Sequence, residues 1–187
     1  MRHNKRALVD VDGVCGDFLG RAKELIYELF ALDVPEERFV TWDVTSVLPD
    51  QEMRDELNDA IAKAGFATWI KPFPEAVEAI REIRSMVELR FVTSPHKASK
   101  TWMRDRHEWL MNHFDAAPEE IVHCFTKHEV VGGLFLDDKP EHVRRWKHYH
   151  PGRKAMLWDC VYNRGPEAEG LARATRWEDV IQVVRGL

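Results

Sequence analysis

Residues 7–18 read ALVDVDGVCGDF, an apolar run broken by two carboxylates and a glycine. The apolar residues 7–9 predict a short buried strand. Because side chains alternate along a strand, Asp10 and Asp12 should point to the same side, where they repel each other unless a cation or a shared proton compensates. Gly13 allows a sharp backbone turn directly afterwards. An ordinary strand followed by an Asp-Gly turn has the same pattern, so this segment alone leaves the function open.

Strands and helices alternate along the rest of the chain. Four further apolar runs predict strands, at 87–92, 121–124, 134–136 and 155–158, the last of which is taken as the final strand. Apolar residues at helical spacing predict helices at 76–83, 98–114 and 177–184. The alternation predicts an α/β fold, a doubly wound (Rossmann-like) parallel sheet with helices on both faces. In such sheets ligands bind at the carboxyl ends of the strands.

The segment between the first strand and residue 72 contains helical patterns but no convincing strand. Apolar residues recur at helical spacing over 25–30 and again over 53–64. The segment is too long for a single crossover connection. Residues 18–72 are therefore interpreted as a small helical cap inserted after the first strand, and residues 1–17 and 73–187 as the core.

Composition and charge exclude several classes of protein. The 187 residues include 27 Lys and Arg against 32 Asp and Glu, a formal net charge of −5. A binder of duplex nucleic acid or of an anionic membrane needs a basic excess, so we expect neither partner. No apolar run approaches the ~20 residues that a membrane helix requires. The three cysteines form no CxxC pair, which argues against structural zinc and a disulfide framework and favours a cytoplasmic location.

Polar side chains follow each of the next three strands. Thr93 and Ser94 stand where hydroxyls and backbone N–H groups would suit a phosphate, although, taken by themselves, they are better explained by a helix N-cap near Ser94 or Ser99. Lys127, after the third strand, could balance phosphate charge, although a lone lysine is more often a surface residue. Asp137 and Asp138 offer carboxylate oxygens without His or Cys, a set that suits magnesium. The alternative for this pair is a solvated turn.

The combination in this order resembles the haloacid dehalogenase-like phosphohydrolases, and within them most closely the 5′(3′)-deoxyribonucleotidases. The resemblance spans about residues 8–140 and is carried by residues 10–18, 72–76, 91–95, Lys127 and 137–140. It implies a catalytic core of this type for residues 1–17 and 73–187. The chain departs from the family at residues 124–126, where the usual Arg-Asp pairing is replaced by Cys-Phe-Thr. It also has Lys139 where the family often has Arg.

The resemblance implies roles for the four acidic residues. Asp10 would be the nucleophile that forms an aspartyl-phosphate, and Asp12 the general acid and base. Mg²⁺ would be bound by Asp10, by the backbone carbonyl of Asp12 and by Asp138. Asp137 would support the metal directly or through water.

The resemblance also implies a substrate site. Thr93, Ser94 and Lys127 would hold the phosphate. In this family the cap supplies aromatic side chains that sandwich the base, and the candidates are Phe18, Trp42, Phe66 and Trp69. The implied activity is magnesium-dependent hydrolysis of nucleoside 5′-monophosphates, deoxyribonucleoside ones in particular. A sugar phosphate or a 3′-phosphate end as substrate, or a non-catalytic phosphate-binding relic, stay open as alternatives. Members of the family are often dimers, so a homodimer is also expected as a possible assembly.

Overall fold

The computed structural model describes residues 2–187 and contains a six-stranded sheet in the order β3-β2-β1-β4-β5-β6. The strands are β1 (Arg6–Val9), β2 (Glu88–Thr93), β3 (Ile121–His123), β4 (Leu134–Asp137), β5 (Lys154–Trp158) and β6 (Arg173–Ala174). All neighbouring strands are parallel. The strand order reverses at β1, which lies between β2 and β4. The predicted doubly wound parallel sheet is therefore confirmed.

Helices connect the strands and build the segment between β1 and β2. The α-helices are α1 (Phe18–Phe30), α2 (Gln51–Ala62), α3 (Pro74–Met86), α4 (Trp102–Phe114), α5 (Pro140–Tyr149) and α6 (Trp177–Arg185). Single 3₁₀ turns form η1 (Arg2–Lys5), η2 (Glu36–Arg38), η3 (Val44–Val47), η4 (Phe66–Trp69), η5 (Pro118–Glu120), η6 (Lys127–Glu129), η7 (Val161–Asn163) and η8 (Pro166–Ala168). No helix within residues 2–187 has both the length and the apolar character needed to cross a membrane.

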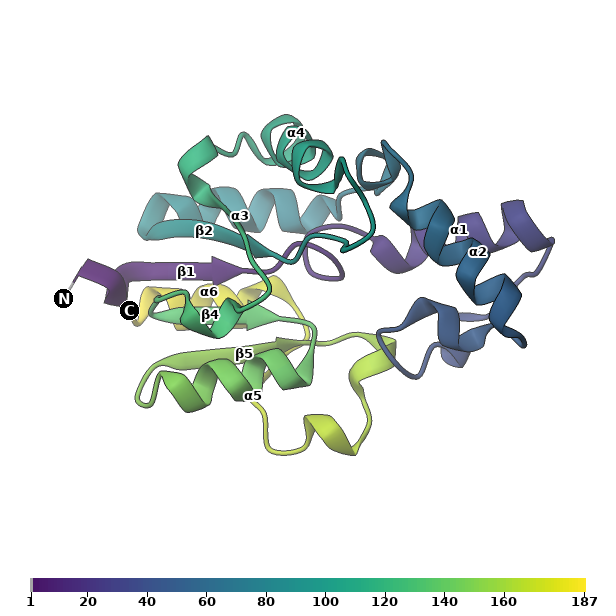
Figure 1. The fold of residues 1–187 in the computed structure, drawn as a ribbon. Coiled ribbons are helices and arrows are strands. Elements are labelled where there is room, and N and C mark those ends of the chain that lie inside the picture. The colour runs from purple at the N-terminus through teal and green to yellow at the C-terminus, as the bar shows by residue number, and fades with distance from the viewer. Residues whose placement is uncertain (1) are drawn as a thin grey trace.

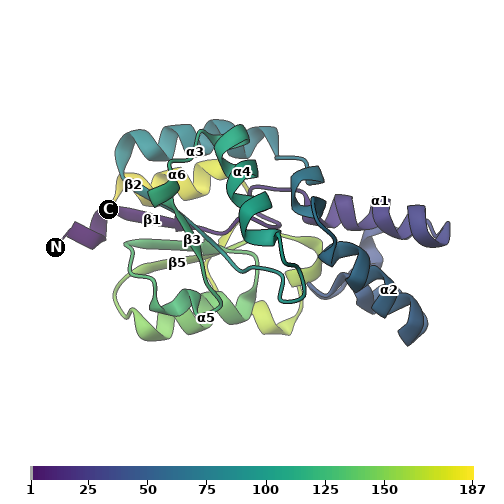
Figure 2. The same cartoon turned by 45° about the horizontal axis from the view of Figure 1, so that its top comes forward.

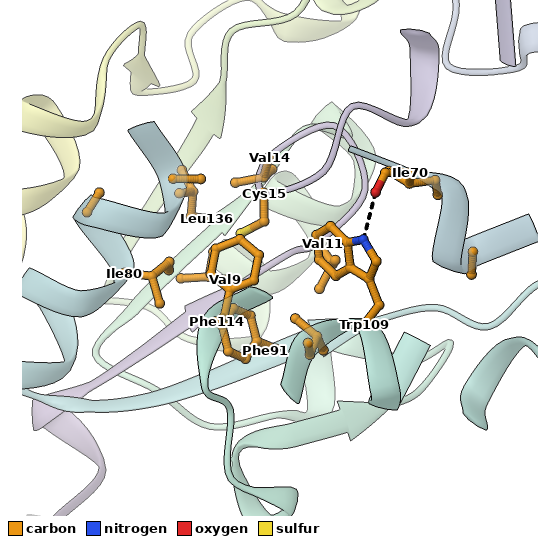
Figure 3. Packing of buried hydrophobic residues seen from close by; sticks show 14 of the residues in the cluster. Val9, Val11, Val14, Cys15, Ile70, Ile80, Phe91, Trp109, Phe114 and Leu136 are labelled. Atoms are coloured by element: carbon orange, nitrogen blue, oxygen red, sulfur yellow. Dashed lines mark hydrogen bonds between the residues drawn. The ribbon is translucent and has the colours of Figure 1, made fainter. Parts of the chain in front are cut away.

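The alternation of side chains along the strands divides the core into two layers. In β1, Ala7 and Val9 belong to a cluster with α3, α4 and α6, whereas Leu8 between them belongs to a cluster with α5. Figure 3 shows the first cluster, in which Val9 lies among side chains of β2, β4, α3 and α4. In the second cluster the ring of Phe135 stacks on Trp146 of α5, with centroids 5.4 Å apart. Both faces of the sheet are therefore covered, as predicted (Figure 1).

The segment 18–72 lies beyond the carboxyl ends of the strands (Figures 1 and 2). It contains α1, α2 and three 3₁₀ turns, and no strand is found among these residues. The chain leaves and re-enters the core at one place, where the N–H of Asp17 donates to the carbonyl of Lys71 at 2.8 Å. The N–H of Phe73 donates to the carbonyl of Cys15 at 2.9 Å beside it. This arrangement is compatible with the predicted cap, whose boundaries stay a prediction.

Two expectations about the elements were wrong. The run at 155–158 is not the final strand, because β6 (Arg173–Ala174) pairs with β5 at the edge of the sheet. A strand of two residues is too short for any periodicity in the sequence to indicate it. The helix expected over 98–114 begins only at Trp102, since residues 95–101 form bends and turns after the proline.

Candidate active site

Three buried aspartates meet where β1 and β4 end. One carboxylate oxygen from each of Asp10, Asp137 and Asp138 lies within 4.8 Å of the other two. The sheet brings them together because β1 and β4 are neighbours, with Val9 paired to Leu136. The residues that follow two adjacent parallel strands emerge at the same edge. Three carboxylates this close repel one another unless positive charge lies among them.

Lys127 supplies part of that positive charge. Its Nζ lies 2.7 Å from Oδ1 of Asp10 and 2.8 Å from Oδ2 of Asp137, and its side chain is buried. Burial acts against the charged ammonium, but the attraction of Asp10 and Asp137 is stronger and raises the pKa of Lys127 above its ordinary value. The side chain is therefore a fixed cation between the two carboxylates. The sequence alternative of a surface lysine is wrong.

The negative charges of the three carboxylates are compensated unequally by the groups around them. Burial, and then the negative charge of Asp137, raise the pKa of Asp10 to about 6, with Lys127 acting in the opposite direction. Burial together with Asp10 and Asp137 raises the pKa of Asp138 well above its usual range. Burial also acts on Asp137, but Lys127 and His142 hold the pKa of that carboxyl below its ordinary value. Asp10 and Asp138 are therefore the two carboxyls whose negative charge the protein compensates least.

Hydrogen bonds also compensate the carboxylate of Asp137 more fully than that of Asp138. Both oxygens of Asp137 are occupied by Lys127, by the N–H of Lys139 at 2.9 Å and by Nδ1 of His142 at 3.1 Å. Asp138 accepts from the hydroxyl of Tyr162 at Oδ2, but its buried Oδ1 has no partner among the described residues. A buried carboxylate oxygen without a donor is costly unless a cation ligates it. The donor set, oxygens from carboxylates, fits Mg²⁺.

Asp12 is held apart from this cluster. Its carboxylate pairs with the guanidinium of Arg106 on α4, a fully buried side chain. The Arg106 guanidinium lies between the rings of Trp102 and Trp109, with Cζ 5.4 and 5.0 Å from their centroids. The interpretation of the sequence missed Arg106, although it shares the apolar face of α4 with both tryptophans at spacings of four and three residues. An arginine on such a face is the signal that could have found it.

The two hydroxyls after β2 have different surroundings. Thr93 is buried, and its Oγ1 has no partner among the described residues. The hydroxyl of Ser94 donates to the carbonyl of Cys124 at 3.1 Å, and so joins the ends of β2 and β3. The expected alternative, an N-cap near Ser94 or Ser99, is wrong because the N-cap of α4 is Thr101.

Two of the four aromatic candidates lie together. The ring of Phe18, the first residue of α1, meets Phe66 edge-on with centroids 6.0 Å apart. Phe66 in turn stacks on Trp102, at 6.0 Å and an interplanar angle of 22°. Phe66 is buried by these contacts. The rings of Phe18, Phe66 and Trp102 therefore form a row of contacts from α1 to α4, and Trp102 also lies beside Arg106.

The other two candidates lie elsewhere. Trp42 is half exposed, and Nζ of Lys139 lies 3.7 Å from the centroid of its ring. Since Lys139 follows Asp138 directly, this contact joins the segment 18–72 to the loop after β4. Trp69 is 70 % exposed, and no aromatic contact joins it to Phe18 or Phe66 among the described residues. The role expected for Trp69 stays a prediction.

Cavity size alone does not identify this site. A cavity of about 840 Å³ is lined by Gly13 and Tyr162 but not by Asp10, Asp12 or Lys127. A smaller one of about 280 Å³ has Lys127 in its wall. The chemistry of the acidic cluster, rather than the volume of a pocket, therefore defines the candidate active site.

Comparisons with known proteins show the family and the fold of the chain. The family model described as "5′ nucleotidase, deoxy (Pyrimidine), cytosolic type C protein" matches residues 4–187. The chain is 26 % identical to the human cytosolic-type 5′(3′)-deoxyribonucleotidase, over 100 % of this chain and 98 % of that protein. It is 27 % identical to the human mitochondrial 5′(3′)-deoxyribonucleotidase, over 76 % and 68 %. A haloacid dehalogenase-like family hydrolase from Streptococcus pneumoniae superposes with a TM-score of 0.62 over 97 % of this chain and 99 % of that one, at 11 % identity. That structural likeness shows the fold.

Proposed function

The chain belongs to the family of deoxy (pyrimidine) 5′ nucleotidases of cytosolic type C, phosphatases with a haloacid dehalogenase-like fold, and on this basis we propose its substrate, metal and mechanism. We propose that it hydrolyses nucleoside 5′-monophosphates, foremost deoxyribonucleoside ones, with Mg²⁺ and through an aspartyl-phosphate. The observation that carries this proposal is the buried cluster of Asp10, Asp137 and Asp138 around Lys127, in which Oδ1 of Asp138 has no partner.

The proposed reaction has two steps. The carboxylate of Asp10 attacks phosphorus, the bond from phosphorus to the nucleoside oxygen breaks, and Asp12 protonates the departing oxygen. Asp12 then accepts a proton from water, which attacks the aspartyl-phosphate, and inorganic phosphate and free Asp10 result. Both proton transfers require a fixed carboxyl at residue 12. The pairing with Arg106 supports this role because it holds the Asp12 carboxylate in one orientation.

The charges in the cluster support the proposed phosphate and metal sites. Asp10, the backbone carbonyl of Asp12 and Asp138 would hold Mg²⁺, with Asp137 in support. When bound, the metal neutralises charge and polarises the phosphoryl group. Lys127 would attract phosphate oxygens and reduce their repulsion by Asp10.

Two hydroxyls complete the proposed phosphate site. The Thr93 hydroxyl is free of other partners among the described residues and would donate to the phosphate. Ser94 would line the same subsite, while its hydroxyl holds the loop to the end of β3 through the carbonyl of Cys124.

The aromatic residues support a nucleoside as the leaving group. Phe18 and the half-exposed Trp42 are proposed to contact the base, at ~1–3 kcal/mol per stacked base. Phe66, buried between Phe18 and Trp102, would hold Phe18 in place. Trp69, expected in the same set, is 70 % exposed and remains a further candidate for contact with the base.

The remaining parts of the proposal concern the surroundings of the enzyme. A small-molecule nucleotide is the proposed partner, in the cytoplasm, as the name of the human cytosolic relative suggests. The expected homodimer, and the absence of duplex nucleic acid and membrane partners, stay predictions.

Phosphate release from a panel of substrates tests the proposed function. The panel contains nucleoside and deoxynucleoside 5′- and 3′-monophosphates, sugar phosphates and a 3′-phosphorylated oligonucleotide, each with Mg²⁺ and with EDTA. We expect Mg²⁺-dependent turnover that is fastest with deoxynucleoside 5′-monophosphates. Turnover confined to sugar phosphates or 3′-ends would contradict the substrate, and full turnover in EDTA would contradict the metal. Binding of nucleotide without turnover would favour the alternative of a non-catalytic phosphate-binding protein.

Replacement of Arg106 tests the proposed role of Asp12. Arg106→Met places an apolar side chain of similar length beside Trp102 and Trp109, but it leaves the Asp12 carboxylate without its partner. We expect kcat to fall about 10- to 100-fold, part of the 10²–10⁴-fold that general acid–base catalysis contributes. Arg106→Lys should restore part of the loss. Arg104→Met on the same helix, at an exposed position, is the matched control and should keep full activity. An Arg106→Met enzyme with unchanged kcat would show that Asp12 needs no positioning.

A further inference from the structure

We propose that Tyr162 and Asn163, in the turn after β5, are positioning residues that fix Asp138 so that only its Oδ1 is presented to the cation. The inference rests on the metal site of the proposed function and concerns how that site selects Mg²⁺. Both residues lie outside residues 8–140, the part of the chain that carries the resemblance to the phosphohydrolases.

Tyr162 occupies one of the two carboxylate oxygens of Asp138. The tyrosine hydroxyl donates to Oδ2, while Oδ1 is buried and has no partner among the described residues. An oxygen from this carboxylate lies within 4.8 Å of oxygens from Asp10 and Asp137. A cation at the cluster would therefore meet a carboxylate with one oxygen already engaged.

Asn163 fixes the backbone of the same residue. Its Nδ2 donates to the carbonyl of Asp138 at 2.7 Å and to the carbonyl of Trp158 at 2.7 Å, and so joins the ends of β4 and β5. Arg173 of β6 donates to Oδ1 of Asn163 at 2.7 Å and to its backbone carbonyl at 2.8 Å. A continuous set of hydrogen bonds thus runs from the edge strand to the acidic cluster.

Gly13 packs against the pair formed by Tyr162 and Asp138. It has a φ of +77°, and a Cβ at this position would lie 2.6 Å from Oδ2 of Asp138 and closer still to the hydroxyl of Tyr162. The Tyr162–Asp138 pair is therefore packed against the turn that follows Asp10 and Asp12. Rotation of the Asp138 carboxylate would break its bond to Tyr162, and the backbone of Gly13 leaves little room on that side.

The consequence concerns the choice between Mg²⁺ and Ca²⁺. Mg²⁺ requires near-octahedral geometry with short bonds, whereas Ca²⁺ accepts more oxygens and often takes both from one carboxylate. Engaging Oδ2 with Tyr162 prevents Asp138 from offering both oxygens. The pair thus disfavours Ca²⁺ and holds Oδ1 ready for Mg²⁺, in the way that residues behind metal ligands orient them elsewhere.

The variant Tyr162→Phe tests the inference, because it removes the hydroxyl and keeps the ring. Isothermal calorimetry of the full chain without nucleotide gives the Kd for Mg²⁺ and for Ca²⁺ separately. We expect the Kd for Mg²⁺ to rise about 10- to 100-fold. We also expect the ratio of the Ca²⁺ Kd to the Mg²⁺ Kd to fall, since Asp138 can now offer both oxygens. Tyr149→Phe, at an exposed tyrosine, is the matched control and should change neither value.

Each other outcome has a definite meaning. Unchanged Kd values in Tyr162→Phe would overturn the inference while leaving the proposed function intact. An equal rise for both cations, with the ratio preserved, would reduce Tyr162 to general structural support and likewise overturn it. A wild-type chain that binds neither cation would remove the proposed metal site itself. Asn163→Ser serves as the second variant: if Tyr162→Phe does not fold by circular dichroism, a rise in the Mg²⁺ Kd of Asn163→Ser is expected, and an unchanged one overturns the proposal.

Discussion

Asp10→Asn is expected to lower kcat for phosphate release by about three orders of magnitude or more, the scale of loss when a nucleophile is removed. An amide at residue 10 cannot attack phosphorus, and no other carboxylate of the cluster is equivalent. Asp137 has both oxygens occupied, and Asp138 holds a different position after β4. The measurement is single-substrate kinetics with a deoxynucleoside 5′-monophosphate at saturating Mg²⁺.

The same substitution should leave the fold intact. The raised pKa of Asp10, about 6, means that its charged form is disfavoured in the folded protein. A carboxyl whose pKa is raised on folding destabilises the folded state once the pH exceeds its pKa in the unfolded chain, and the loss is complete above its pKa in the folded protein. A neutral amide removes that cost, so at pH 8 without metal the free energy of unfolding should equal or exceed that of the wild type.

An exposed aspartate provides the control for charge alone. Asp33→Asn removes the same charge from the surface of the segment 18–72, so both kcat and the unfolding midpoint should stay unchanged. Turnover by Asp10→Asn within tenfold of the wild type would refute the assignment of the nucleophile.

Lys127→Met is expected to have the largest effect on stability. The methionine fills a similar volume, but it leaves the carboxylates of Asp10 and Asp137 buried without their shared cation. Breaking a buried ion pair on one side costs about 3–5 kcal/mol, and we expect a loss of this size in urea unfolding without metal. Mg²⁺ should restore stability more in the variant than in the wild type, because a bound cation replaces part of the lost positive charge.

The matched control for Lys127 is a lysine whose ion pair lies in water. Lys71, 75 % exposed, pairs with Glu24 at 2.7 Å, and Lys71→Met should leave the unfolding midpoint unchanged. Equal small effects of the two substitutions would mean that Lys127 is not needed to compensate the cluster.

Two kinds of sequence information were enough to predict the acidic cluster. The spacing of apolar residues placed the strands that Asp10 and Asp137 follow or end, and a parallel sheet puts the carboxyl ends of its strands at one edge. That these two strands are neighbours came from the structure. The joint metal site of Asp10 and Asp138 was implied by the resemblance to the phosphohydrolases.

The partners of these aspartates could not be predicted in the same way. Arg106 reaches Asp12 from a helix 94 residues further along the chain, with two tryptophans beside its guanidinium. Tyr162 and Asn163 lie in a 3₁₀ turn without any periodic pattern, and their contact with Asp138 depends on how the chain leaves β5. Such contacts across the fold have no signature in the local sequence.

The sequence also could not predict which aromatic residues of the segment 18–72 are buried and which are exposed. Sequence identifies Phe66 and Trp69 as equal candidates, three residues apart. The turn at Gly65, with a φ of +86°, and the bond from its N–H to Asp105 at 2.8 Å set the orientation of η4. Phe66 consequently packs inward on Phe18, whereas Trp69 is exposed. The decision depends on a contact with α4, about forty residues further along the chain.

The central position of β1 has a consequence for the folding of this chain. β1 precedes all other strands, yet it pairs only with β2 and β4, through contacts such as Arg6 to Glu88 and Ala7 to Leu134. Contacts so distant in sequence carry a large loop-closure cost and slow folding. During synthesis β1 emerges long before either partner, and the whole segment 18–72 emerges in between. The strand that precedes Asp10 therefore stays unpaired until then, and the active site can assemble only after most of the chain has been made.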